Sequence, residues 1–427
     1  MSAGTLAVVA ASIVLWALLS ARLTRWSITA PIFFVVLGLV TAHGPVTLVH
    51  IQLQSSTILG LVELTLAVVL FSDASRVNVR AMRGGFAVPL RLLGIGLPLT
   101  AGVGIGIAAG LFGGSGIWVA AALGMIVAPT DAALGAAIME DDRVPAVVRR
   151  SLNIESGLND GIATPFVNLF LAGAAASEAV SNLGVGQAAV ELVGGAGIGI
   201  GIGAVGAWLL ARAARARWST TGSRALGVLA LAVCAFATAR QAGTNGFVAA
   251  FVAGLAYGSV TPYEEDALFF TEDAGQLLSL LVWFVFGAVM LVPGVRAAGW
   301  RDLVFAILVL TVARMLPVAV ALAGTGLSRS TTAFIGWFGP RGLASVVFGL
   351  IAYDTLSPGP AKVVLAATVT TVALSVLAHG LSASQLAGRY GAAVQRLGPE
   401  APERRRAPTI ATRGLSGLGY RARRTDA

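Results

Sequence analysis

Acidic side chains inside apolar stretches are the residues of this sequence most able to do chemistry. Asp131 lies in IVAPTDAALGAAIM, and both Glu155 and Asp160 lie in LNIESGLNDGIATPF. A third stretch, FIGWFGPRGLASVVF, carries Arg341. Ionisable groups are costly inside such segments and commonly belong to ion or proton paths. The sequence therefore predicts a buried site in which Asp131 and Asp160 bind a proton or a small cation.

Helical spacing places further oxygen atoms near Asp160. Residues four apart lie on one face of a helix, one turn above the other. Ser156 and Asp160 form such a pair, and so do Glu155 and Asn159. Hard cations bind oxygen ligands, and a carboxylate also binds protons. A carboxylate with a hydroxyl one turn away could therefore belong to an oxygen cage for a small cation.

Two prolines predict interruptions in the helices that carry the motifs. Proline removes a backbone donor and clashes with the preceding turn, so we expect breaks at Pro129 in APTD and at Pro340 in FGPRG. Broken membrane helices are tolerated where the freed backbone groups line a site, and matching breaks in two halves of a chain indicate a transporter. The broken spans are the fifth and the twelfth of those counted below. This odd offset makes the two copies antiparallel and predicts an inverted repeat.

The elements that hold these residues are predicted to be membrane-spanning helices. Of the 427 residues, 56% are hydrophobic and 11% are charged, whereas soluble domains carry about 25% charged residues. A span needs about 20 apolar residues, and about thirteen stretches qualify. We therefore predict an all-α polytopic membrane protein with spans near residues 5–22, 28–48, 55–72, 90–112, 116–139, 152–175, 187–210, 224–241, 243–260, 273–293, 302–323, 331–353 and 361–384.

The distribution of arginine predicts how the chain is oriented. Arginines follow the first, third, fifth and seventh stretches and fill the tail, which places the N-terminus outside and the C-terminus in the cytoplasm. The acidic loop 261–273 also falls on the cytoplasmic side, but acids count little in this rule. We expect residues 1–390 to form the transmembrane domain and residues 391–427 to form a disordered cytoplasmic tail. Lysine occurs only at Lys362, which favours a GC-rich bacterial genome and a bacterial plasma membrane.

Other kinds of site have little support in the sequence. Cys234 is the only cysteine, and the three histidines are scattered as expected for loop or interface residues, so we predict neither a transition metal nor a cofactor. The net charge of +9 lies in loops and tail rather than in a nucleic-acid motif. The glycine-dense run at 195–206 follows no strand pattern and indicates helix packing. Ser156 lacks a nearby histidine and a G-x-S-x-G motif, which argues against a hydrolase.

Several further ionisable residues lie in or beside these spans. Because an unpaired arginine at mid-membrane is very costly, we predict a structural ion pair between Glu155 and Arg341. Asp73 ends the third span, where it either lines an access path to the site or marks the end of the helix. The sequence assigns no role to Glu63 or Arg314, which also lie within spans.

Together, APTD, ESGLND and FGPRG resemble motifs of the monovalent cation:proton antiporter family 1, the bacterial sodium/proton exchangers related to the animal sodium/hydrogen exchangers. The stretches at 247–258 and 281–290 are similar to that family too, and the likeness runs through residues 1–390. The resemblance implies the sodium/proton antiporter fold, with inverted repeats and two broken crossing helices. It also implies a homodimer in which a core domain of each protomer moves against dimerisation helices.

The resemblance further implies a mechanism. Asp160 would carry either the proton or the cation, and exchange would follow from competition for this carboxylate. Asn159 stands where electrogenic relatives have the first of two aspartates, which implies electroneutral exchange. The expected function is exchange of Na⁺, or Li⁺, for H⁺, with a K⁺/H⁺ antiporter or a cation channel as alternatives. The implied site and its support comprise Thr130, Asp131, Ser156, Asn159, Asp160, Glu155 and Arg341.

Overall fold

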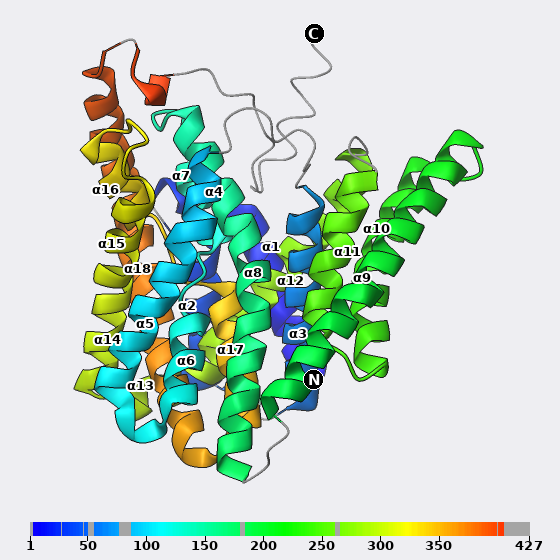
Figure 1. Cartoon of the computed structure of the whole chain (residues 1–427), viewed down its shortest axis with the longest axis horizontal. Helices are drawn as coiled ribbons and strands as arrows, with labels where there is room; N and C mark the ends of the chain where they lie inside the picture. Colours follow the sequence, from blue (N-terminus) through cyan, green and yellow to red (C-terminus); the bar gives the residue numbers. More distant parts are fainter. Residues whose placement is uncertain are drawn as a thin grey trace.

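The computed structural model describes residues 3–26, 28–45, 47–49, 55–76, 87–179, 184–260, 265–398 and 400–404. All regular secondary structure in these residues is helical (Figure 1). Every apolar stretch predicted from the sequence coincides with one helix or with two or three helical elements that follow each other closely. The first half contains α1 (Ala3–Arg25), α2 (Ala30–His43), α3 (Ser56–Ser75), α4 (Ala87–Arg91), η2 (Leu92–Gly96), α5 (Leu97–Phe112), η3 (Gly113–Ser115), α6 (Ile117–Ile126), α7 (Ala132–Met139), α8 (Ala146–Ala179) and α9 (Gly184–Arg215).

The second half is likewise helical and ends in one long helix. It contains α10 (Thr221–Gln241), α11 (Gly246–Val260), α12 (Glu265–Val285), η4 (Phe286–Met290), α13 (Leu291–Ala297), α14 (Trp300–Leu310), α15 (Val312–Ala321), α16 (Arg329–Trp337), α17 (Leu343–Thr355), α18 (Pro358–Gln395) and η5 (Pro402–Arg404). The elements η2 and η4 are single π-helical turns that join their neighbours into continuous spans, so neither ends a helix.

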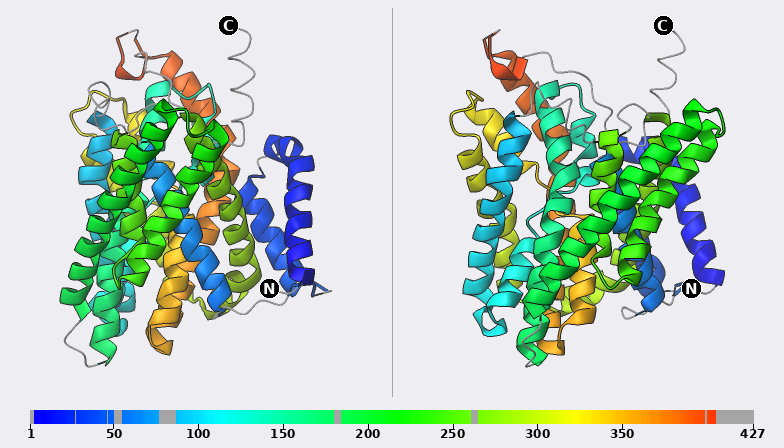
Figure 2. Two further views of the ribbon diagram at one scale, coloured as in Figure 1. Left: turned by 90° about the vertical axis from the view of Figure 1, so that its right-hand side faces the viewer. Right: turned by 45° about the vertical axis from the view of Figure 1, so that its right-hand side comes forward.

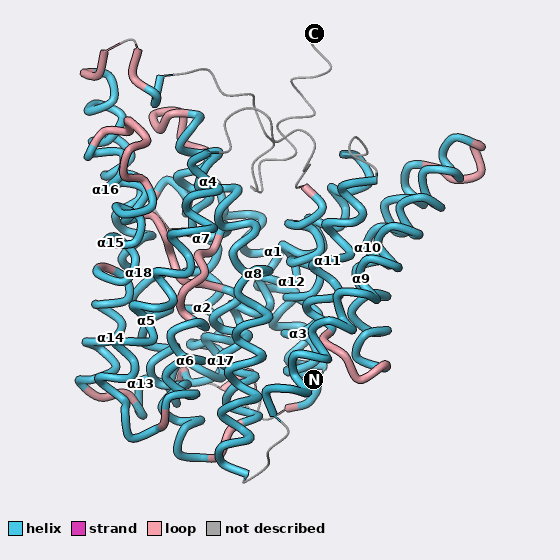
Figure 3. Tube along the Cα trace, viewed as in Figure 1, coloured by secondary structure: helices cyan, strands magenta, loops and turns pink. Residues whose placement is uncertain are grey.

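Two spans are broken at mid-depth, as the prolines predict. The chain leaves helical geometry between α6 and α7 and again between α16 and α17, and Figure 3 shows both interruptions as loop segments within the bundle. In Figure 1, α7 and α16 lie towards one end of the bundle, whereas α6 and α17 lie towards the other. The two broken spans therefore run in opposite directions, as expected for an inverted repeat.

The helices form two packed sets around these breaks. Helices α5, α6, α8, α14, α15, α17 and α18 pack mainly with one another, while α2, α3, α9, α10, α11 and α12 form the second set. Helix α1 packs on α2 and stands at the edge of the molecule (Figure 2). The site residues predicted from the sequence lie in or beside the first set.

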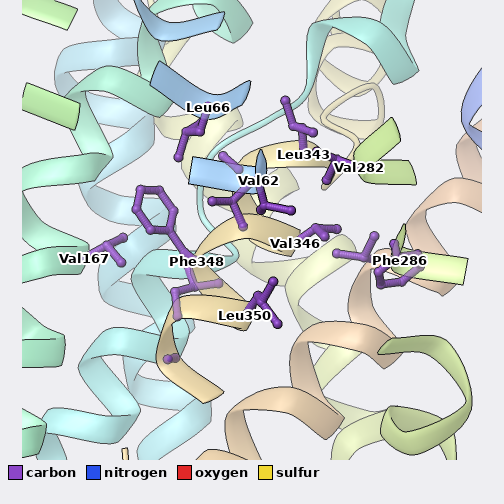
Figure 4. Close-up of a cluster of buried hydrophobic side chains, with 14 of the residues drawn as sticks. Val62, Leu66, Val167, Val282, Phe286, Leu343, Val346, Phe348 and Leu350 are labelled. Atoms are coloured by element: carbon purple, nitrogen blue, oxygen red, sulfur yellow. The ribbon is translucent and has the colours of Figure 1, made fainter. Parts of the chain in front are cut away.

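An apolar cluster joins the two sets beneath the breaks. In this cluster, Phe348 of α17 lies between Val167 of α8 and Val62 and Leu66 of α3 (Figure 4). All four side chains are buried. Because these contacts are apolar and lack directional hydrogen bonds, they hold the sets together without fixing polar groups between them.

The outer surface is suited to lipid rather than water. Val190 and Val193 on α9 are 71% and 75% exposed, and eight helical stretches in the described residues are long and apolar enough to cross a membrane. Shorter apolar helices include α2 and α11, and also α6 and α17, which are each one half of a broken span. A helical bundle satisfies its backbone hydrogen bonds internally, which the bilayer requires. The chain is therefore a multi-pass membrane protein.

The boundary predicted at residue 390 falls inside a helix. Helix α18 continues without interruption to Gln395, and the η5 turn then packs against the start of α16. Glu403 of this turn is buried. Residues 405–427, most of the predicted disordered tail, lie outside the described residues.

Candidate functional site

The two broken spans are bonded to each other where they cross. The backbone N–H of Asp131 donates to the carbonyl of Pro340 at 2.8 Å. The hydroxyl of Ser345, on α17, donates to the carbonyl of Ile126 at the end of α6, at 2.7 Å. A proline-induced break frees such backbone groups, and here each break supplies partners to the other. The crossing predicted from two separate motifs is therefore a single hydrogen-bonded unit.

Asp131 joins the N-termini of two half-helices. Its Oδ1 accepts the backbone N–H of Leu134 at 2.9 Å in α7, and its Oδ2 accepts that of Leu343 at 2.6 Å in α17. A carboxylate is favourable at a helix N-terminus, where the dipole is positive and the N–H groups lack partners. Gly342 permits the approach, because a Cβ there would lie 2.1 Å from Asp131 Oδ2. Both oxygens of Asp131 are thus engaged in holding the crossing.

A small polar network connects the first break to α8. Thr130 Oγ1 lies 3.0 Å from Ser156 Oγ, and Asn159 Nδ2 donates to Thr130 Oγ1 at 2.7 Å and to its carbonyl at 3.2 Å. All three side chains are buried. The i, i+3 spacing of Ser156 and Asn159 puts both on the face of α8 that meets the break. The sequence predicted these residues in one site, and the structure brings these three together.

Asp160 differs from Asp131 in its hydrogen bonding. It is 6% exposed, yet within the described part of the chain no side-chain or backbone donor bonds to its carboxylate. Both acids line one cavity of about 210 Å³. This cavity reaches from the breaks to Glu140, at the end of α7, and to Glu272, on α12. Of the two predicted acids, only Asp160 presents a carboxylate to the cavity with no internal bond to give up.

Asp73 lies against α8 rather than in the wall of this cavity. It is buried near the end of α3, and a Cβ on Gly157 would lie 3.9 Å from Asp73 Cβ. Gly157 follows Ser156 directly, so Asp73 is close to the polar network. Its neighbour Ser72 lines the cavity. Asp73 thus lies near the end of α3 and beside the site, but it does not line the cavity itself.

The prediction that Glu155 pairs with Arg341 is wrong, because the partner of Glu155 in the structure is Arg314. Glu155 receives a bidentate pair from Arg314, with Nη1 to Oε1 at 2.5 Å and Nη2 to Oε2 at 2.9 Å. Glu155 and Arg314 are only 1% and 2% exposed. Arg341 instead donates from Nη1 to the carbonyl of Gly339, within its own break, at 2.5 Å. Spacing along the chain could not decide between Arg314 on α15 and Arg341 in the second break, and Arg314 packs directly against Gly339.

Other charges that the sequence left without a role also pair between helices. Glu63 on α3 accepts Arg240 of α10 at 2.9 Å. Glu272 belongs to residues 261–273, which were predicted to be an acidic loop, but it lies on α12 and pairs with Arg76 at the end of α3. Glu272 also lines the cavity. Its acidity gave a signal in the sequence, but only the packing of α12 on α3 reveals its position.

Comparison with known proteins agrees with this arrangement. The family model for the transmembrane domain of sodium/hydrogen exchangers matches residues 8–388. The chain is 25% identical over 369 residues to "K(+)/H(+) antiporter NhaP2" of Shewanella sp. (strain ANA-3) and 24% identical to the protein of that name from Shewanella oneidensis. Each match covers 86% of this chain but 63% of the relative, so the chain spans less than two thirds of their length.

A solved structure shares the fold. The sodium proton antiporter MjNhaP1 of Methanocaldococcus jannaschii superposes with a TM-score of 0.73 at 18% identity, covering 91% of this chain and 98% of that one. Identity this low supports the fold alone. The family match extends over nearly all of the helical bundle and includes both breaks and α8. The chain belongs to the sodium/hydrogen exchanger family.

Proposed function

We propose that this protein is a secondary active transporter, not an enzyme, and that it exchanges a monovalent cation for H⁺ across the membrane. The observation that carries the proposal is the difference between two buried acids. Asp131 uses both carboxylate oxygens to hold the half-helices, whereas the carboxylate of Asp160 faces the cavity and has no donor among the residues that the structure describes. A carboxylate that binds and releases ions must not be held by hydrogen bonds within the protein. Asp160 meets this condition, and Asp131 does not.

Competition for Asp160 would couple the two ions. The carboxylate binds either H⁺ or the cation, because a proton removes the negative charge that attracts the cation. Ser156 lies one turn away, and the hydroxyl of Thr130 lies 3.0 Å from that of Ser156, so neutral oxygens are available beside the charge. Rocking of the set of helices around the breaks would then expose the occupied site to the other side. Asp131, Asn159, Asp73 and the Glu155–Arg314 pair would support this site.

The cation proposed is Na⁺, with Li⁺ as a second substrate. Support for Na⁺ comes from the resemblance of the motifs and from the fold shared with a sodium proton antiporter. K⁺ is the second candidate, because two sequence relatives are named K(+)/H(+) antiporters. We propose one cation per proton, since Asn159 adds no second carboxylate beside Asp160.

Purified protein in liposomes loaded with a pH-sensitive dye tests this function. Addition of Na⁺, Li⁺ or K⁺ outside should alkalinise the lumen for each cation that the protein exchanges, because inward movement of the cation drives protons out. Under the proposal, clamping the membrane potential with valinomycin and K⁺ leaves Na⁺-driven proton movement unchanged, because exchange is electroneutral. Cation flux that proceeds fully without counter-movement of protons would identify a channel instead.

We also propose a bacterial plasma-membrane location, with the N-terminus outside and the C-terminus in the cytoplasm, and a homodimer. Arg25, Arg76 and Arg149 support this orientation, because they lie at or beside the ends of α1, α3 and α8 that share one side of the bundle (Figure 1). The cavity then reaches Asp160 from the cytoplasm. A C-terminal fusion to a reporter active only in the cytoplasm tests the orientation, and light scattering of the detergent-solubilised protein tests the dimer.

A further inference from the structure

His379 is a buried residue whose place in the fold the sequence did not predict. The sequence pattern suggested a loop or interface residue, but His379 lies within α18 and is 2% exposed. Helix α18 runs beside α16 (Figure 1). The ring of His379 packs against those of Trp337 and Phe338, with centroids at 5.3 and 6.4 Å. Both residues lie where α16 ends and the second break begins.

His379 and Ser375 bind the two ends of that break. His379 Nε2 lies 2.8 Å from the carbonyl of Trp337, the last residue of α16. Ser375 Oγ accepts the backbone N–H of Arg341 at 2.7 Å, and it lies 3.2 Å from His379 Nδ1. His379 Nδ1 also lies 2.9 Å from the backbone carbonyl of Ser375, so both ring nitrogens face a carbonyl, and a neutral ring can donate to only one of them. With its proton on Nε2, His379 donates to Trp337, whose carbonyl also accepts the N–H of Gly339 at 2.8 Å, and Nδ1 accepts from the Ser375 hydroxyl. One carbonyl and one N–H of the break are then both satisfied by α18.

The spacing of the pair sets the length of the break. Ser375 and His379 are four residues apart, so they lie about 6 Å apart along one face of α18. This distance holds Trp337 and Arg341 at a fixed separation across a segment that lacks helical hydrogen bonds of its own. Pro340, between them, presents the carbonyl that accepts the N–H of Asp131.

The first half of the chain contains a counterpart of this arrangement. Helix α8 follows the first break as α18 follows the second. Ser156 on α8 contacts Thr130, the residue after Pro129, just as Ser375 contacts Arg341, the residue after Pro340. The residue four positions beyond the serine is Asp160 in one half and His379 in the other. The same spacing thus supplies an exchangeable acid in one copy and a neutral bridging ring in the other.

We infer that His379, through Ser375, is a positioning residue that fixes the second break and so holds Asp131 and the crossing in the geometry that binds the cation. This inference rests on the proposed function for its effect on transport, but the clamp itself is a structural feature. Loss of the ring leaves the carbonyl of Trp337 and the hydroxyl of Ser375 without these partners. The break then loosens, and the position of Pro340 is no longer set.

The test compares His379→Ala, His379→Gln and Ser375→Ala with His43→Ala. His43 Nε2 also contacts a backbone carbonyl, that of Ala288 at 3.0 Å, but on helices that form neither break. Each variant is purified, checked for a single elution peak, and assayed in liposomes for the apparent KM for Na⁺ and the maximal rate. Hydrogen–deuterium exchange of the peptide spanning residues 338–343 is measured on the same samples.

We expect His379→Ala to raise the apparent KM about tenfold, the effect of one lost buried hydrogen bond, with a smaller change in maximal rate. The 338–343 peptide should exchange faster in His379→Ala and Ser375→Ala but not in His43→Ala. Glutamine, whose amide can reach Trp337, should restore part of both properties. Unchanged hydrogen–deuterium exchange of this peptide in folded His379→Ala and Ser375→Ala proteins overturns the clamp, and if His379→Ala does not fold, unchanged exchange in Ser375→Ala does so alone. If the wild-type protein does not exchange cations, the proposed function is refuted instead. The hydrogen–deuterium exchange of the 338–343 peptide still tests the clamp in that case.

Discussion

Replacement of Glu155 by Gln removes the partner of Arg314 and leaves a buried guanidinium uncompensated. Breaking a buried ion pair from one side costs about 3–5 kcal/mol. With an unfolding entropy of about 2.1 cal/mol/K per residue over this chain, that cost lowers the melting temperature by about 3–6 °C. The pair is bidentate, with N···O distances of 2.5 and 2.9 Å, which favours the upper part of this range.

A double-mutant cycle assigns the partner of Glu155. Glu155→Gln combined with Arg314→Met removes both charges, so the double variant should melt no lower than either single variant. The coupling energy is then about 3 kcal/mol. The matched cycle with Arg341→Met should give a clearly smaller coupling, because Arg341 donates to Gly339 and interacts with Glu155 only through its charge. The assay is thermal unfolding of the purified protein followed by tryptophan fluorescence. Strong coupling to Arg341 together with additivity for Arg314 would refute the assignment.

Three further predictions follow from contacts at the crossing and at the tail. Gly342→Ala places a Cβ 2.1 Å from Asp131 Oδ2, so we expect this variant to lose most cation-driven proton flux in liposomes. Gly359→Ala, whose Cβ would lie in open space, should retain the flux. Equal fluxes in the two variants would contradict the role of Asp131. Asn159→Asp replaces a donor to two Thr130 oxygens with an acceptor when ionised, so the melting temperature should fall at neutral pH and recover on acidification, and a pH-independent melting temperature would count against the network. Burial alone raises the pKa of Glu403, but hydrogen bonds from the Ser328 N–H and the Thr331 hydroxyl outweigh it and lower the pKa below its usual 4.5. Because the pKa of Glu403 is lower in the folded protein, docking of the η5 turn is complete above pH of about 4.5 and is lost as the pH falls through the lowered pKa. Amide exchange of residues 400–404 should therefore accelerate in acid, and it should accelerate at neutral pH in Glu403→Gln. Slow exchange in that variant at neutral pH would contradict the docking.

Much of the architecture could be predicted because it depends on local chemistry. Apolar length predicts spans, and Pro129 and Pro340 predict breaks because proline removes a backbone donor. Proline alone is not sufficient for a break, since Pro165 and Pro317 lie inside the continuous helices α8 and α15. The four-residue spacings of Ser156 and Asp160, and of Glu155 and Asn159, likewise predict that each pair shares a face of α8. These properties depend on short segments, so they can be predicted without knowing which other helices the segments pack against.

The errors came from contacts between distant segments. Whether Arg314 or Arg341 meets Glu155 depends on how α15 packs against the second break, which no local pattern encodes. The same holds for His379, which resembles any isolated histidine until α18 is placed beside α16. The resemblance of the motifs singled out Asp160 as the carrier, but only the position of Leu343, far along the chain, shows that both carboxylate oxygens of Asp131 are hydrogen-bonded.

Replacement of Asp160 by Asn tests the central claim most directly. The measurement is Na⁺-driven proton movement in liposomes, with Asp302→Asn as the matched control because Asp302 is also buried but caps α14, where it accepts the N–H of Gly299 at 2.8 Å. If Asp160 is the exchanged carboxylate, the Asp160→Asn protein folds yet moves no protons in response to Na⁺, while Asp302→Asn remains active. Full exchange by Asp160→Asn would contradict the account.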